Sequence, residues 1–369
     1  MDFDFYQRLA DSALADCLLE PPLCERVLTD PTLDLLGLLN AAFAVRQRYF
    51  GKSVQVHILN NAQNGGCPED CAYCSQARSS QAGIAAYPIK SEDEILEEAR
   101  CAYEAGAYRY CMVFAGRGPD DPRVKQLAQL VGKIKRRYPI QVCISAGLLG
   151  IDQARILADA GLDRLNHNLN TSRKHYPSIC TTHSFDDRLR TLEAARRAGL
   201  GICSGLIAGM GESPHDLVEV AATLRQLNCA SIPVNFLLPF DGNRLETPRG
   251  LDPQYCLRIL CLFRLTNPRA EIRCAAGREF HLRSMEVMCL YPANSLFLDG
   301  YLNARGALRQ RTYQMIRDAG FEIDSQKDLD ELAQQGPVDQ EGETVSPEGG
   351  VTNPLKSLLQ LRPARNGAK

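Results

Sequence analysis

A repeated alternation of short apolar strands and longer amphipathic helices constrains the fold of this chain most strongly. It begins near residue 53 and continues to about residue 320. The eight expected strands cover residues 54–59, 108–114, 140–145, 163–169, 200–207, 231–237, 270–275 and 294–298. A helical stretch follows each strand, and several of these stretches end in Ala-Gly, a common helix stop. The pattern predicts an α/β fold, a TIM-type (β/α)8 barrel with functional groups at the carboxyl ends of its strands.

Shorter segments flank the expected barrel on both sides. Residues 1–50 are expected to be helical, with Asp30 as the N-cap of a helix that continues towards Tyr49. We therefore expect an N-terminal helical cap over 1–50, the barrel over 51–322, and a poorly ordered polar tail over 323–369. The tail has room for a short helix around 354–361, and the last two barrel helices are expected at 278–291 and 304–319.

The side-chain alternation along these strands separates an apolar outer face from a polar inner face. Val54, Val56 and Ile58 share the apolar face of the first strand. The opposite positions carry mainly amide, thiol and charged groups, namely Gln55, His57, Cys111, Gln141, Cys143, Ser145, Asn166, Asn168, Asn170, Cys203, Asn235, Glu271 and Arg273. A purely structural barrel has layers of Val, Ile and Leu instead, so this lumen predicts a binding pocket.

Three cysteines follow the first strand at the spacing C-x3-C-x2-C: Cys67, Cys71 and Cys74. Three thiolates in one loop favour a single inorganic centre, and a cubane cluster held by three cysteines leaves one iron open to a small molecule. Zinc is the alternative, but a structural zinc site takes four ligands. No Cys or His lies within the next eight residues, and His57 could serve only across a strand.

Cys111, Cys143 and Cys203 form a second set, because lumen positions on three different strands converge only if the barrel closes. A buried free cysteine is a common small core residue, so each of them alone indicates little. Together they suit a second iron–sulfur centre, although spacing does not identify its fourth ligand. The remaining cysteines, Cys180 and Cys274 among them, lie on expected helices, loops or outer positions and are assigned no chemistry.

The cysteine count is informative because the chain has 15 of them in 369 residues. The start of the chain has neither the basic region nor the apolar region of a secretory signal, and no stretch approaches the ~20 apolar residues of a membrane helix. We therefore expect a cytoplasmic protein whose cysteines are reduced and free to bind metal. The net charge of −2 gives no reason to expect nucleic acid or a membrane as a partner.

Two further features point towards small ligands. Asn168 and Asn235 belong to a set of lumen amides that both donate and accept, so a pair of them suits a neutral ligand such as a urea ring, or satisfies other barrel groups. The glycine-rich stretch 205–211 allows close approach to a flat ligand such as a nucleoside, or simply forms a strand-to-helix turn.

The cysteine motif, with Tyr73 before its last Cys, resembles the radical S-adenosylmethionine superfamily and, within it, the biotin synthase family. Further similar segments follow in the same order at 110–112, 166–172, 203–212 and 275–279. The resemblance implies a sulfurtransferase that converts dethiobiotin to biotin, the last step of biotin biosynthesis. It also implies a reducing electron donor such as flavodoxin or ferredoxin, a homodimer, and no acid–base residue, because cofactors carry the chemistry.

The resemblance assigns roles to individual residues. Cys67, Cys71 and Cys74 would hold a [4Fe-4S] cluster whose open iron binds S-adenosyl-L-methionine, the source of a 5′-deoxyadenosyl radical. Further S-adenosylmethionine contacts would come from Tyr73, Asn170, Arg188 and Ile207.

The same resemblance makes Cys111, Cys143 and Cys203 the holders of a sulfide-donating [2Fe-2S] cluster, with Arg273 as its fourth ligand. Asn168 and Asn235 would hold the ureido ring of dethiobiotin. Two features depart from the pattern. Asn170 stands where some members have Asp, and Cys274 beside Arg273 would be an alternative ligand if a bulge turned it inward.

Overall fold

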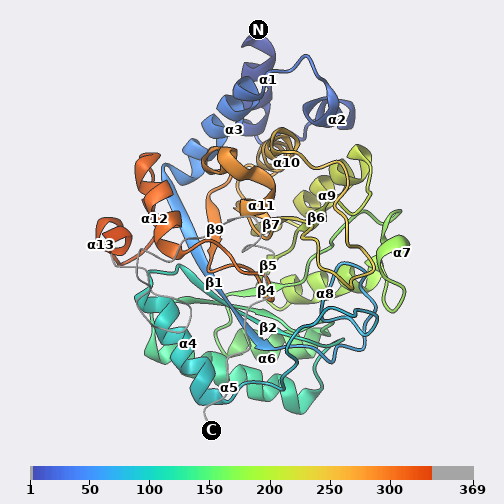
Figure 1. The fold of residues 1–369 in the computed structure, drawn as a ribbon, viewed down its shortest axis with the longest axis vertical. Helices are drawn as coiled ribbons and strands as arrows, with labels where there is room; N and C mark the ends of the chain where they lie inside the picture. The colour runs from blue at the N-terminus through green and yellow to red at the C-terminus, as the bar shows by residue number, and fades with distance from the viewer. Residues whose placement is uncertain (1–2, 335–369) are drawn as a thin grey trace.

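The computed structural model describes residues 3–334, and within them parallel strands close into a barrel of eight strand positions (Figure 1). The strands are β1 (Ser53–Gln63), β2 (Arg109–Phe114), β3 (Gln141–Ser145), β4 (Arg164–Asn166), β5 (Gly201–Cys203) with β6 (Leu206–Ala208), β7 (Ser231–Phe236), β8 (Glu271–Cys274) and β9 (Ser295–Leu298). Pairing of β1 with both β2 and β9 closes the barrel. The predicted (β/α)8 barrel is confirmed.

The fifth position is two short strands because the chain bends at Ser204 and Gly205. Both β5 and β6 pair with β7. A Cβ atom on Gly205 would lie 1.9 Å from the carbonyl oxygen of Pro233, so only glycine lets the two backbones come this close. Packing between strands therefore explains this glycine without a ligand.

Helices cover the outside of the barrel (Figure 1). They are α4 (Glu92–Glu104), α5 (Asp121–Arg137), α6 (Ile151–Asp159), α7 (Tyr176–Ile179), α8 (Phe185–Arg197), α9 (Pro214–Gln226), α10 (Pro253–Thr266), α11 (Arg278–Leu282) and α12 (Arg309–Asp318). Ser91, Ser184 and Ser213 begin α4, α8 and α9 through reciprocal capping boxes. The core lies between helices and strands, where outer-face residues such as Val54, Val56 and Met112 are fully buried.

The N-terminal helices lie over one end of the barrel, near α10 (Figure 1). They are α1 (Phe3–Leu14), α2 (Pro21–Thr29) and α3 (Leu35–Phe50). The helix start predicted at Asp30 is wrong: Asp30 terminates α2, and its carboxylate accepts a hydrogen bond from the Thr32 N–H at 2.9 Å. Asp34 caps α3 instead by accepting from the Gly37 N–H at 3.1 Å.

The expected helices at 278–291 and 304–319 also differ from the structure. The first is α11 followed by a 3-10 helix, η1 (Arg283–Leu290), because Arg283 has a φ of 53°, which an α-helix cannot continue through. The second begins only at Arg309. Before it, the chain folds back on itself through paired backbone hydrogen bonds between Tyr301 and Ala304.

The described chain continues past the barrel for a short distance. β10 (Glu322–Ile323) pairs with the start of β1, and α13 (Leu329–Gln334) packs on α12 and buries Leu332. The structure thus describes residues 323–334 of the expected tail. The rest of that tail, 335–369, lies outside the described residues, and so does the helix expected at 354–361. Among residues 3–334, no helix combines the length and apolar character that crossing a membrane requires.

Candidate active site

A cavity of about 230 Å³ opens at the carboxyl ends of the barrel strands. Segments that follow each strand position contribute to its wall. The wall includes all residues that the resemblance linked to the first cluster, S-adenosylmethionine and dethiobiotin: Cys67, Cys71, Tyr73, Cys74, Asn168, Asn170, Arg188, Ile207 and Asn235. The fold thus brings these nine residues to one cavity, although their positions span most of the barrel sequence.

The cysteine loop is held in place by a segment much later in the chain. The Asp70 carboxylate accepts hydrogen bonds from the backbone N–H groups of Thr181 at 2.9 Å and Thr182 at 3.3 Å, and from the Thr181 hydroxyl. The Ala72 N–H donates to the Ile179 carbonyl at 2.8 Å. Cys71 is buried, while Cys67 and Cys74 are half-buried against the cavity. These contacts tie the cysteine loop to residues 179–182.

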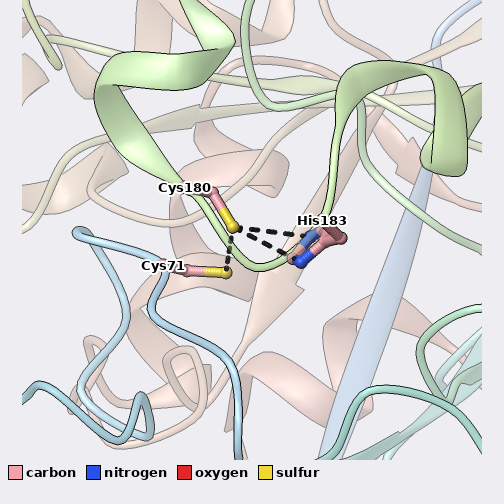
Figure 2. Close-up of side chains that lie close together, drawn as sticks. All are labelled: Cys71, Cys180 and His183. Atoms are coloured by element: carbon pink, nitrogen blue, oxygen red, sulfur yellow. Dashed lines mark hydrogen bonds between the residues drawn. The ribbon is translucent and has the colours of Figure 1, made fainter.

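Cys180 and His183, from the stretch between α7 and α8, lie against Cys71 (Figure 2). The Sγ atoms of Cys71 and Cys180 are 3.8 Å apart, and Nδ1 of His183 is 3.3 Å from Sγ of Cys180. The hydrogen bond between the two thiols raises the pKa of Cys71 and lowers the pKa of Cys180 to about 4. Sequence reasoning missed both residues, because no spacing rule links Cys180 to a motif 109 positions earlier.

Arg188, on α8, is a buried cation at the cavity wall. Its guanidinium donates to the Asn168 carbonyl and to Nε2 of His183, both at 2.8 Å, and to the Tyr176 hydroxyl. These bonds hold a charged planar donor beside the cysteine loop, a geometry suited to a ligand carboxylate.

Asn168 and Asn170 lie beyond the end of β4, which is shorter than predicted. Asn170 has a φ of 70°, a conformation that asparagine tolerates better than most residues, and its amide donates to the Tyr73 hydroxyl at 2.6 Å. The Asn168 side-chain oxygen accepts from the Gly205 N–H at 3.0 Å. Its amide nitrogen has no hydrogen bond to another described residue, which leaves a donor for a ligand carbonyl.

Asn235, on β7, is held at both ends of its side chain. Its amide nitrogen donates to the Leu206 carbonyl at 2.9 Å, and its oxygen accepts from the Ala276 N–H at 3.2 Å. The nitrogen also donates to the Pro233 carbonyl at 3.5 Å, whereas the oxygen has capacity for a second hydrogen bond. Asn235 can therefore present an oriented acceptor to a ligand in the cavity.

The second cysteine set converges deeper in the barrel. Cys111 and Cys143 are register neighbours on β2 and β3, and the Cys143 thiol hydrogen-bonds both Cys111 and Cys203. The Asn166 amide donates to Sγ of Cys203 at 3.3 Å. The hydrogen bond with Cys143 is the main cause that lowers the pKa of Cys203 to about 5, and it also lowers the pKa of Cys111. Closure of the barrel therefore places three thiols together as the strand alternation predicted.

Arg273, on β8, completes this inner group. Its guanidinium donates to the Ser231 hydroxyl at 2.9 Å and to the Glu271 carboxylate, and it lies 4.8 Å above the Phe297 ring. Its Nε atom is buried without a hydrogen-bond partner among the described residues. A nitrogen in this position is available to a further group in the lumen.

A smaller cavity is lined by Cys111, Cys143 and Arg273. Four residues line both this cavity and the main one: Val113, Ser145, Asn166 and Tyr301. The two cavities are therefore neighbours that share a wall.

Cys274 does not join the inner group. The pairing of β8 with β7 and β9 continues through Cys274 without a bulge, so its side chain keeps the outer orientation. There its thiol hydrogen-bonds Cys289. The geometry gives no support to Cys274 as an alternative ligand.

Comparisons with known proteins agree with this arrangement. Residues 64–224 match the model of the radical SAM superfamily, and residues 233–322 match that of the Biotin and Thiamin Synthesis associated domain. A biotin synthase of Magnetococcus marinus is 56% identical over 316 residues, which cover 86% of this chain and 98% of that protein. A biotin synthase of Acaryochloris marina is 54% identical over 82% of this chain and 88% of its own length.

The fold also resembles solved structures. The crystal structure of methylornithine synthase superposes with a TM-score of 0.74 at 21% identity, over 88% of this chain and 99% of that chain. This similarity supports the barrel architecture.

Proposed function

The chain belongs to the biotin synthase family of radical S-adenosylmethionine enzymes, and on this premise we propose how its two neighbouring cavities convert dethiobiotin to biotin. One observation carries the proposal: the outer cavity, which Cys67, Cys71 and Cys74 line, shares a wall with an inner cavity, which Cys111 and Cys143 line. A substrate at this wall is adjacent to both groups at once. Insertion of sulfur into a carbon chain needs such an arrangement, because one centre activates the carbon and the other supplies the sulfur.

The residues present fit two iron–sulfur groups. Cys67, Cys71 and Cys74 would hold the [4Fe-4S] cluster, since thiolates are the ligands that such clusters take. We propose a [2Fe-2S] cluster on the inner group, Cys111, Cys143, Cys203 and Arg273, because three lumen thiols lie together beside the Arg273 guanidinium. The family resemblance alone makes Arg273 its fourth ligand, since Glu271 and the thiols raise the pKa of Arg273 and a charged guanidinium has no free lone pair. When bound, these groups and S-adenosylmethionine supply a carbon radical that removes hydrogen atoms and a sulfide that replaces them.

The polar residues of the outer cavity bind and orient the two small molecules. Arg188, fixed by three hydrogen bonds, offers its charge to the carboxylate of S-adenosylmethionine, and Asn170 with Tyr73 and Ile207 lines the same region. Asn168 offers a free amide donor and Asn235 an oriented amide to the ureido ring of dethiobiotin. These contacts fix which carbons of the substrate face the radical source.

The lumen protects the reaction from water. The inner thiols are packed against Leu59, Ala275 and Phe297, all buried. Enclosure of this kind matters because a primary carbon radical reacts with most groups that it meets. The barrel wall thus provides selectivity that the cofactors lack.

The activity requires a one-electron reductant, and we propose a flavodoxin or ferredoxin in this role. We also propose that the chain forms a homodimer, as the family resemblance implies. Sedimentation velocity of the full chain tests the second point, since a monomer at micromolar concentration would contradict it.

The function is tested by anaerobic reconstitution of the full chain with iron and sulfide, followed by Mössbauer spectroscopy and an assay for biotin. We expect signals of two cluster types, and biotin from dethiobiotin in the presence of S-adenosylmethionine and reductant. A single cluster type would refute the two-centre proposal, and absence of biotin despite both clusters would refute the assigned activity.

A further inference from the structure

Cys71, Cys180 and His183 form a compact group of soft donors whose geometry has not been used above. Their ligand atoms all lie within 4.8 Å of one another, and all three residues are buried (Figure 2). Two come from the stretch between α7 and α8, and the third from the cysteine loop. The packing of Asp70 against Thr181 and Thr182 holds these two segments together.

The separations match those of a tetrahedral metal site. With metal–sulfur bonds of about 2.3 Å and metal–nitrogen bonds of about 2.0–2.1 Å, tetrahedral angles place two sulfurs about 3.8 Å apart and a sulfur and a nitrogen about 3.5 Å apart. The observed distances are 3.8 Å between the two Sγ atoms and 3.3 Å between Sγ of Cys180 and Nδ1 of His183. The ligand atoms of Cys71 and His183 lie within 4.8 Å of each other. The ion would take the place of the Nδ1 proton that His183 now directs at the Glu69 carboxylate.

The surrounding charges favour a cation. The Asp70 carboxylate lies 3.3 Å from Sγ of Cys180, and the Glu69 carboxylate contacts Nδ1 of His183. Two guanidinium groups oppose it: that of Arg188, 2.8 Å from Nε2 of His183, and that of Arg117, 3.2 Å from the Glu69 carboxylate. The two carboxylates and the two thiolates of an occupied site still outnumber these two cations, and a carboxylate oxygen can complete four donors.

We propose that Cys71, Cys180 and His183 bind a single soft divalent cation, Zn²⁺ or Fe²⁺, in the cluster-free protein. Cys71 cannot serve both this ion and a [4Fe-4S] cluster, so the two occupancies exclude each other. The mutual exclusion rests on the proposed function, in which Cys71 is a cluster ligand, whereas binding of the ion does not. A metal ion held by Cys71, Cys180 and His183 would therefore compete with assembly of the [4Fe-4S] cluster.

The first experiment titrates the cluster-free full chain with Co²⁺ under anaerobic conditions and records its absorption. The Cys67→Ala/Cys74→Ala background is used, because in it Cys71 is the only thiol of the loop that can bind the ion. This background should bind one more equivalent than the same background with Cys180→Val, which keeps the site filled, and should show sulfur-to-cobalt charge transfer and intense tetrahedral d–d bands. In this background His183→Gln should weaken that equivalent more than about tenfold, since even outer-sphere partners of a metal contribute ~10–100-fold. Cys261→Val, at a fully buried position on α10, is the matched control and should leave the binding in this background unchanged.

The second experiment loads the protein with Zn²⁺ before cluster reconstitution. Zn²⁺ should slow the appearance of [4Fe-4S] absorption more in the wild type and in Cys261→Val than in Cys180→Val. Equal Co²⁺ stoichiometry and spectra with and without Cys180→Val in the Cys67→Ala/Cys74→Ala background would overturn the proposal. Equal slowing by Zn²⁺ in the wild type and Cys180→Val would overturn it as well. Without Zn²⁺, Cys180→Val should still form biotin after reconstitution. If the chain binds Co²⁺ as expected but the wild type makes no biotin, the proposed function is refuted and the proposed metal site is not.

Discussion

Glu271→Gln should destabilise the protein strongly, because Glu271 is the buried anion between two buried arginines. Its carboxylate accepts from Arg109 at 2.8 Å, from the Ser295 hydroxyl at 2.9 Å and from Arg273. Glu271 is 4% exposed, and Arg109 and Arg273 are each 1% exposed. Glutamine keeps the shape of the side chain but removes the carboxylate that is the main counter-charge of both guanidinium groups.

Removal of one partner from a buried ion pair costs ~3–5 kcal/mol, because the remaining charge is left uncompensated in a region of low dielectric. We expect at least the lower value, since two arginines are affected. With an unfolding entropy of ~2.1 cal/mol/K per residue, a loss of this size lowers the Tm of a 369-residue chain by roughly 4–6 °C. Differential scanning calorimetry of the cluster-free protein under reducing conditions measures it.

Glu92→Gln is the matched control, since it removes a carboxylate from a solvent-exposed pair. Glu92 accepts from Lys133 at 2.6 Å, but the two side chains are 47% and 38% exposed. Exposed pairs contribute ~0–1 kcal/mol, so its Tm should fall by no more than about 2 °C. If the Tm of Glu271→Gln lies within about 2 °C of the Tm of Glu92→Gln, the argument that Glu271 compensates two buried charges is refuted.

Three further predictions concern the inner cysteines, the substrate and pH. Cys143→Ala should keep the S-adenosylmethionine-binding cluster in its electron paramagnetic resonance spectrum but form no biotin; biotin formation would contradict sulfur donation from the inner group. Asn168→Ala should raise KM for dethiobiotin roughly tenfold through loss of one hydrogen bond and leave KM for S-adenosylmethionine unchanged, and an equal rise in both would contradict its role. Asp216→Asn tests a buried carboxylate: burial raises the pKa of Asp216, but hydrogen bonds from Ser172 and Ser213 outweigh burial and hold it below the ordinary 3.8. The stabilising effect of the ionised carboxylate is therefore complete above pH 3.8 and is lost as the pH falls through the lowered pKa. The Tm difference between Asp216→Asn and the wild type should thus be constant from pH 7 to 5 and shrink below 3.8. A Tm difference that grows on acidification would contradict a lowered pKa.

Local patterns were sufficient to predict the barrel and the convergence of its inner cysteines. Strand alternation predicted that Cys111, Cys143 and Cys203 face the lumen, and in a closed barrel side chains on that face of neighbouring strands lie close together. The same alternation placed Cys274 outside, where the structure has it. Cysteine spacing and the same alternation also pointed to Cys67, Cys71, Cys74, Asn168, Asn170 and Asn235. Arg188 was found only through family resemblance, because it lies on a helix whose own pattern does not mark it as functional.

The features that sequence reasoning missed depend on contacts between distant segments or on single backbone angles. Cys180 and His183 become metal-binding candidates only because the cysteine loop docks beside them. The break at Arg283 arises from one positive φ in an otherwise helical sequence. Asp30 and Asp34 are both plausible N-caps four residues apart, and tertiary packing decides between them.

The docking of the cysteine loop has a consequence for how the protein matures. Asp70 is held by Thr181 and Thr182, which lie 111 and 112 positions further along the chain. During synthesis, residues 67–74 leave the ribosome long before these partners, and they cannot reach their final conformation until the fourth strand and α7 have been made. The docked conformation of the loop is therefore acquired late, once about half of the barrel strands have been made.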